Sequence, residues 1–127
     1  MASRRLEDLH PDIQSLAAKH IKLCRQAGID LLIYCTYRSQ TEQKTLYAQG
    51  RTKPGARVTW TLKSKHGNTM DGKPASLAYD CVPIVKGKAV WSDRELYAQV
   101  GKLGEEIGLK WGGRWKSPDS PHFELCE

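Results

Sequence analysis

The sequence contains no long apolar run. A membrane-spanning helix needs ~20 consecutive apolar residues, and no stretch of this chain approaches that length. Its beginning, MASRRLEDLH, also lacks the apolar centre of a secretion signal. We therefore expect a protein that is made in the cytoplasm and has no membrane span.

Closely spaced cysteine pairs are missing as well. The chain has four cysteines at scattered positions, Cys24, Cys35, Cys81 and Cys126. Without a CxxC pair, a structural zinc site or a redox centre built from cysteines is disfavoured. We expect reduced thiols that mostly fill the core.

Acidic residues are fewer than basic ones. The 20 Lys and Arg residues against 14 Asp and Glu residues give a net charge of +6, which attracts anionic partners such as nucleic acid or an anionic bacterial envelope. The basic residues are scattered from Arg4 to Lys116 without a dense cluster, and none of the usual nucleic-acid motifs is visible. We therefore expect no specific nucleic-acid partner.

The length of 127 residues suits one compact domain, which we expect to be a monomer. Apolar spacing and capping patterns predict helices between residues 6 and 28, 39 and 50, and 92 and 108. Strands are expected at 29–36, 77–85, 89–91 and 123–125. The predicted fold class is α+β, with about three helices packed on a small, mainly antiparallel sheet.

Residues 51–76 are expected to form a long loop, because glycines and prolines interrupt any periodicity there. Loops of this length in a compact domain commonly carry function. Of the four histidines, His10 is expected to start the first helix and His20 to lie on its apolar face. The other two, His66 in the loop and His122 at the last strand, are candidates for chemistry.

Two carboxylates accompany these histidines. Asp80 follows His66 on the next strand, and Asp119 precedes His122 by three residues. Two histidines and one carboxylate are a recurring ligand set of catalytic zinc, which generates a nucleophile from water, and a second carboxylate then transfers the proton. Spacing alone leaves open both this site and a chance arrangement, in which Asp119 is only a turn residue.

Several short segments together resemble a known signature. In order along the chain they are Ser64–His66, Ala78–Asp80, Trp111–Gly113 and Asp119–Phe123, with Tyr37–Ser39 and Gln49–Thr52 upstream. This series resembles the zinc peptidases that include phage L-alanyl-D-glutamate endolysins and bacterial D-alanyl-D-alanine carboxypeptidases, whose pattern SxHxxGxAxD is followed near the C-terminus by a carboxylate, two residues and a histidine. The resemblance runs from about residue 37 to residue 125.

The resemblance implies roles for individual residues. It makes His66, Asp80 and His122 the zinc ligands and Asp119 the catalytic base. Arg38, which spacing alone would place in a surface ion pair, would face the substrate carbonyl and its developing negative charge.

The resemblance also places Ser64 beside a ligand or the substrate as an orienting residue. The tryptophans are expected in different places. Trp91 and Trp111 are expected in the core, whereas a core position and a position in the cleft are both open for Trp60 and Trp115.

The chain departs from the family pattern in two regions, the segment between His66 and Asp80 and the position of Arg114. Thirteen residues separate His66 from Asp80 instead of six, and Ser76 replaces the motif glycine. We interpret the extra residues as a surface insertion, since loop-closure entropy grows only slowly with length. Asp71 within it is the alternative ligand, but no apolar strand follows it, so Asp80 is preferred. Arg114 is the second departure, at a position where relatives often carry a small polar or acidic residue.

The resemblance implies a zinc-dependent peptidase that cuts the peptide stems of peptidoglycan. We expect an L-alanyl-D-glutamate endopeptidase that acts as a phage or prophage endolysin, without a separate wall-binding domain, and that leaves the host cytoplasm for the periplasm or wall after holin-type release. The alternatives are a D-alanyl-D-alanine carboxypeptidase of the same family and a non-catalytic wall-binding or nucleic-acid-binding module. The basic charge would draw the enzyme to the anionic envelope, an attraction that weakens as salt rises.

Overall fold

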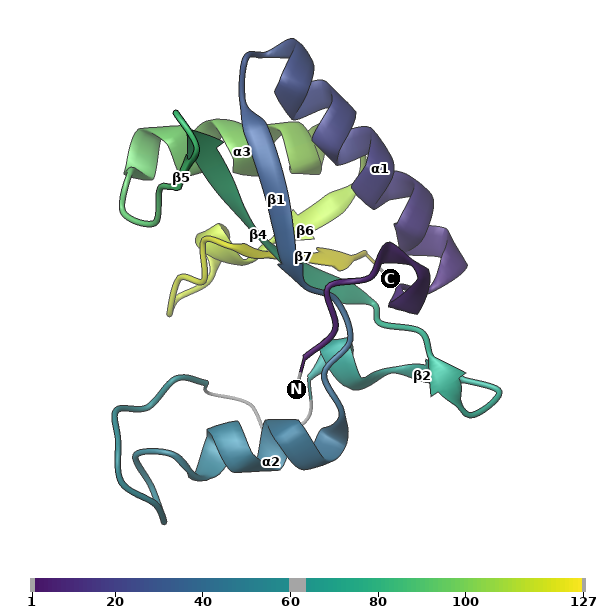
Figure 1. Cartoon of the computed structure of the whole chain (residues 1–127), viewed down its shortest axis with the longest axis vertical. Coiled ribbons are helices and arrows are strands. Elements are labelled where there is room, and N and C mark those ends of the chain that lie inside the picture. Colours follow the sequence, from purple (N-terminus) through teal and green to yellow (C-terminus); the bar gives the residue numbers. More distant parts are fainter. Residues whose placement is uncertain (1, 60–63, 127) are drawn as a thin grey trace.

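The computed structural model describes residues 2–59 and 64–126, which form three α-helices and seven strands in the order shown in Figure 1. The helices are α1 (Pro11–Gln26), α2 (Gln40–Ala48) and α3 (Arg94–Glu106). The strands are β1 (Asp30–Cys35), β2 (Thr69–Met70), β3 (Lys73–Pro74), β4 (Ala78–Val85), β5 (Lys88–Ala89), β6 (Leu109–Trp111) and β7 (His122–Leu125). Among the described residues, no helix is both long enough and apolar enough to cross a membrane.

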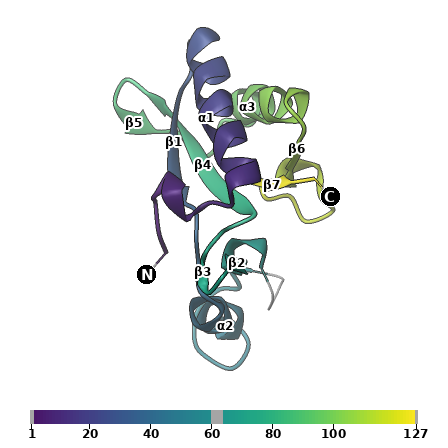
Figure 2. The same ribbon diagram turned by 90° about the vertical axis from the view of Figure 1, so that its right-hand side faces the viewer.

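The main sheet is antiparallel throughout. Its strand order is β1-β4-β7-β6, and β5 pairs with the far end of β4. Helices α1 and α3 pack against this sheet and against each other (Figures 1 and 2). The α+β class is confirmed, with one difference: α2 lies beyond the end of β1 and not on the sheet beside the other two helices (Figure 1).

The helix ends follow from local capping. The His10 side chain accepts a hydrogen bond from the Asp12 backbone at the start of α1, so its expected helix-start position is confirmed. Ser39 and Glu42 form both bonds of a capping box at α2. At α3 the cap is Asp93, whose carboxylate accepts from the Leu96 backbone. Asp93 is one residue later than the Ser92 cap that the sequence pattern predicts.

The insertion between His66 and Asp80 takes the form of a small hairpin. Strands β2 and β3 pair with each other and not with the main sheet. Asp71 and Gly72 form the turn with φ angles of 54° and 75°, the left-handed conformation that tight turns require. Every residue from Thr69 to Pro74 is exposed, so the extra length is accommodated outside the core.

Strand β4 separates a helix-facing side of the sheet from an open side. Tyr79 and Cys81 belong to the buried core, whereas Asp80 between them points to the opposite side, because side chains alternate along a strand. The expectation that Cys81 turns away from Asp80 is confirmed. The core side includes His20, whose ring contacts Tyr79 and the Val100 carbonyl, as expected for a satisfied core histidine.

The cysteines and tryptophans follow the expectations only in part. All four cysteines are free, and three of them are buried while Cys126 is exposed. Trp111 is buried as expected, but the core prediction for Trp91 is wrong: it is 57% exposed and rests edge-on against Tyr34. Trp91 follows the short strand β5 and lies outside the main sheet, so its ring contacts Tyr34 and is otherwise largely exposed to solvent.

Candidate active site

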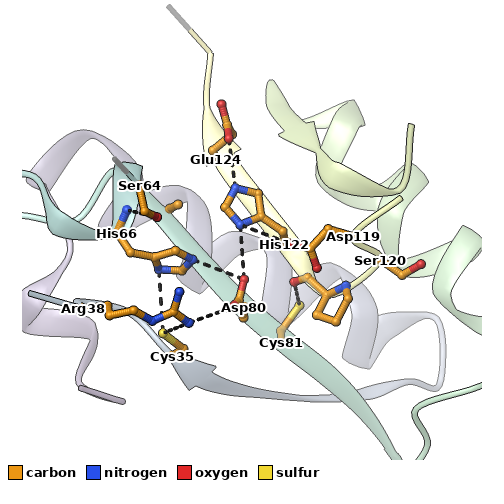
Figure 3. Close-up of polar contacts among 12 residues, drawn as sticks. Cys35, Arg38, Ser64, His66, Asp80, Cys81, Asp119, Ser120, His122 and Glu124 are labelled. Carbon is orange, nitrogen blue, oxygen red and sulfur yellow. Dashed lines mark hydrogen bonds and ion pairs between the residues drawn. The ribbon is translucent and has the colours of Figure 1, made fainter. Parts of the chain in front are cut away.

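Three of the residues singled out from the sequence meet on the open side of the sheet (Figure 3). Asp80 Oδ1 lies 3.3 Å from His66 Nε2 and 3.2 Å from His122 Nδ1. Asp80 and His122 are direct partners in the β4–β7 pairing, and His66 comes from a short 3-10 turn, Lys65–Gly67. All three residues are buried.

Each histidine is oriented by a hydrogen bond at the ring nitrogen that points away from Asp80. His66 Nδ1 lies 2.8 Å from the Thr36 carbonyl, and because a carbonyl only accepts, Nδ1 carries the proton. His122 Nε2 lies 2.9 Å from a Glu124 carboxylate oxygen and donates to it in the same way. Each neutral imidazole therefore presents a lone pair to Asp80 Oδ1.

This arrangement fits a divalent cation. Asp80 Oδ1 lies within 3.3 Å of each of the two nitrogen lone pairs, and the oxygen and the lone pairs repel unless a proton or a cation lies between them. Imidazole and carboxylate are typical zinc ligands, and three protein ligands leave a fourth position open for water. The site can thus hold zinc and still admit a substrate.

Without a cation, protons on His66 and His122 separate the ring nitrogens from the Asp80 carboxylate. Burial opposes protonation of His66, but its contacts with Asp80 outweigh burial and raise its pKa to about 10. The balance at His122 is similar, and the pKa of this residue is also raised by Asp80. Burial would raise the pKa of Asp80, yet the two histidines hold it far below the usual range.

Asp119 lies beside this cluster and remains accessible. Its Oδ2 is 4.0 Å from His122 Nδ1, and its side chain is 49% exposed. Burial and the negative charge of Asp80 raise the pKa of Asp119, as suits a group that exchanges protons. A turn position, the simpler interpretation of Asp119, is compatible with this geometry, since the Asp119 carbonyl accepts from the His122 backbone.

Arg38 approaches from the other side. Its Nη2 is 3.7 Å from Asp80 Oδ2, and its Nη1 donates to Gln43 Oε1 at 3.1 Å. The Cys35 sulfur also contacts the guanidinium, at 3.5 Å. Arg38 is therefore part of the cluster and not an isolated surface residue, and its charge is held at the rim of the site.

A cleft of about 790 Å³ opens over these residues. Ser64 lines it, and the Ser64 hydroxyl accepts from the His66 backbone N–H at 3.2 Å, so it steadies the turn that carries His66. Trp115 also lines the cleft, with its ring 4.9 Å from that of His122. Trp60 lies outside the described residues.

Two members of the site do not figure in the sequence predictions. Glu124 binds the outer nitrogen of His122, and Cys35 lies 3.7 Å from His66 Nδ1. Glu124 is two residues after His122 on a strand, so strand alternation alone places it on the same side of the sheet. Cys35 gives no comparable signal, since its contact with His66 joins residues 31 positions apart in the sequence.

The structure distinguishes Asp80 from Asp71, the two candidate carboxylate ligands. Asp80 lies between the histidines, whereas Asp71 is exposed at the tip of the β2–β3 hairpin. Arg114, the other departure from the pattern, forms an ion pair with Glu105 on α3 at 2.9 Å and is absent from the lining of the cleft.

Comparison with known proteins identifies the family. The sequence model of a family described as D-alanyl-D-alanine carboxypeptidase matches residues 59–125. The chain is 33% identical to the peptidoglycan L-alanyl-D-glutamate endopeptidase CwlK of Bacillus subtilis, over 93% of this chain and 74% of CwlK. The chain belongs to this family of zinc peptidases. The resemblance that the short sequence segments indicate is confirmed.

Solved structures support the same fold for this peptidase. The L-Ala D-Glu endopeptidase ChiX of Serratia marcescens superimposes with a TM-score of 0.73 at 24% identity, covering 99% of this chain and 89% of ChiX. The D,D-pentapeptidase VanY, solved as an E175A mutant in complex with Zn(II), gives a TM-score of 0.64 at 14% identity, over 92% of this chain and 72% of VanY. The peptidase thus has the fold of these two enzymes.

The raised histidine pKa values predict how zinc affects stability. Zinc held by His66 and His122 would displace the protons on both rings, so its binding would strengthen as pH rises. In the zinc-free protein, a raised histidine pKa stabilises the fold fully below the unfolded value of about 6.5, and this contribution is lost as pH rises toward about 10, the pKa of His66. The Tm difference between zinc-loaded and chelator-treated peptidase should therefore widen from about pH 6 to about pH 9.

Thermal unfolding of both forms across this range measures the effect. His20, whose pKa is lowered by burial, affects both forms equally and cancels in the difference. A Tm difference that stays constant or shrinks with rising pH would contradict the proton-for-zinc exchange.

Proposed function

We propose that this peptidase is an L-alanyl-D-glutamate endopeptidase that cuts the peptide stems of peptidoglycan. The observation that carries the proposal is the 33% identity to CwlK over 93% of this chain, combined with a cleft of about 790 Å³ that is lined by His66, Asp80 and His122. An endopeptidase must accept substrate on both sides of the scissile bond, and the lining of this cleft extends beyond the cluster to residues such as Val58 and Lys116.

In this proposal, metal binding and proton transfer are carried out by different residues of the cluster. His66 Nε2, Asp80 and His122 Nδ1 would hold the zinc, which would polarise the scissile carbonyl and lower the pKa of a water toward neutrality. Asp119 accepts the proton of the attacking water and passes it to the leaving amine. Its partial exposure lets it reach a substrate in the cleft.

Arg38 completes the proposed mechanism. Its guanidinium stabilises the negative charge that develops on the carbonyl oxygen, an interaction stronger in the transition state than in the ground state. Its bond to Gln43 holds the guanidinium in place before substrate arrives. Ser64 supports the site indirectly, through the turn that carries His66.

The second candidate is a D-alanyl-D-alanine carboxypeptidase, which the description of the matching family favours. Digestion of purified peptidoglycan distinguishes the two activities. We expect new L-Ala carboxyl ends and D-Glu amino ends, identified by mass spectrometry and end-group labelling. Release of free D-Ala from otherwise intact stems would overturn the endopeptidase assignment.

Two substitutions separate the proposed base from the proposed ligands. Asp119→Ala should keep its zinc but lose roughly 10²- to 10⁴-fold in kcat, the usual contribution of a general base. His122→Ala should lose both zinc and activity. Metal content and hydrolysis rate of the purified variants measure this, with Glu106→Ala, an exposed carboxylate change on α3, as control. A fully active Asp119→Ala would refute the base assignment.

We further propose that the enzyme serves in lysis as a phage or prophage endolysin, made in the host cytoplasm and reaching the periplasm or wall once the membrane opens. The net charge of +6 supports this role, because it would concentrate the enzyme at the anionic envelope.

A turbidity assay on permeabilised Gram-negative cells tests the lytic role. We expect clearing that a chelator abolishes and added zinc restores, and that slows as ionic strength rises because salt screens the surface charge. Binding to the cells without clearing would identify a wall-binding relative. Clearing that is indifferent to salt would refute the role of the charge.

A further inference from the structure

Glu124 makes two charged contacts at once. One carboxylate oxygen lies 2.9 Å from His122 Nε2, and the other lies 2.8 Å from Lys65 Nζ. The residue is 6% exposed. Figure 3 shows the carboxylate directed at the side of the His122 ring that faces away from Asp80.

Lys65 connects this carboxylate to the other histidine. It directly precedes His66 in the 3-10 turn, and its backbone carbonyl accepts a hydrogen bond from Leu77, the residue before β4. Lys65 is thus fixed at its backbone while its side chain reaches Glu124. Through these contacts, one carboxylate joins β7, which carries His122, to the turn that carries His66.

We propose that Glu124 is a positioning residue for the zinc site: it holds the His122 proton on Nε2, so that Nδ1 faces the metal, and it keeps the His66 turn in place through Lys65. The inference rests on the ligand roles proposed above for these two histidines. In this role, Glu124 orients both histidines before zinc binds.

The chemistry of the buried carboxylate explains why the residue matters. A carboxylate accepts from the His122 ring and cannot donate to it, so it enforces one tautomer; a glutamine amide can donate, which would move the proton to Nδ1 and block the metal position. A carboxylate that binds the outer nitrogen of a histidine ligand typically contributes ~10- to 100-fold to metal affinity.

A substrate contact is the competing role, because Lys65 and Glu124 also line the cleft. The two roles differ in what they change. A positioning role changes the zinc dissociation constant and leaves KM near its wild-type value once the site is saturated with zinc. A substrate contact raises KM and leaves zinc affinity unchanged.

The test measures zinc affinity by competition with a chelator at one fixed pH. Glu124→Gln should bind zinc ~10- to 100-fold more weakly, and Lys65→Met, which leaves the Glu124–His122 bond intact, about tenfold more weakly or less. Lys102→Met is the matched control, because it removes the same charge from an exposed position on α3 and should leave zinc affinity unchanged.

Two further readouts make the outcome decisive. In zinc-loaded wild-type protein, NMR should show a slowly exchanging N–H proton on the His122 ring, and Glu124→Gln should lose it. Since Lys65 is one-third exposed, Lys65→Met should fold even if Glu124→Gln does not, and its KM should match wild type at saturating zinc.

The failures of this inference and of the proposed function are distinguishable. If His122→Ala weakens zinc binding but Glu124→Gln and Lys65→Met do not, the ligand assignment stands and the positioning role is refuted. If His122→Ala itself leaves zinc affinity unchanged, the ligand assignment fails. A raised KM with unchanged zinc affinity in Lys65→Met identifies a substrate contact and overturns the proposal.

Discussion

The site depends on the antiparallel pairing of β4 with β7, which sets Asp80 directly opposite His122. Neighbouring strands fix this distance through backbone hydrogen bonds, so the carboxylate and the imidazole meet without help from any loop. The turn that carries His66 only has to bring one more nitrogen to an existing pair. The same pairing buries Tyr79 and Phe123 on the helix-facing side, so the packing of the core and the shape of the site are determined together.

Much of the fold can be predicted from local patterns. Apolar spacing and capping residues locate the three helices, and runs of β-branched residues locate β1 and β4, because these signals depend on nearby residues only. The position of α2 and the exposure of Trp91 cannot be predicted from such local signals. Each depends on which surface remains uncovered after the chain has folded, and Trp91 has the same apolar character whether a helix covers it or not.

In the candidate site, too, some features can be predicted from the sequence and others depend on the tertiary fold. The resemblance to known peptidases names His66, Asp80, Asp119, His122 and Arg38, and the structure brings them together across a hairpin insertion that the family pattern lacks. Strand alternation is enough to place Glu124 beside His122. Its pairing with Lys65 could not be predicted, because residues 59 positions apart in the sequence meet only through the tertiary fold.

The loop that carries Asp119 is anchored at its two ends and not along its middle. A Cβ atom at Gly112 would lie 2.6 Å from the Asp119 carbonyl oxygen, and the Trp111 indole donates to the Ser120 carbonyl at 2.8 Å. The residues between, Lys116, Ser117 and Pro118, are exposed and line the cleft. Natural variation, or a library built by directed evolution, can therefore change these three positions and alter the surface that a ligand meets in the cleft, while the cluster around Asp80 stays where it is.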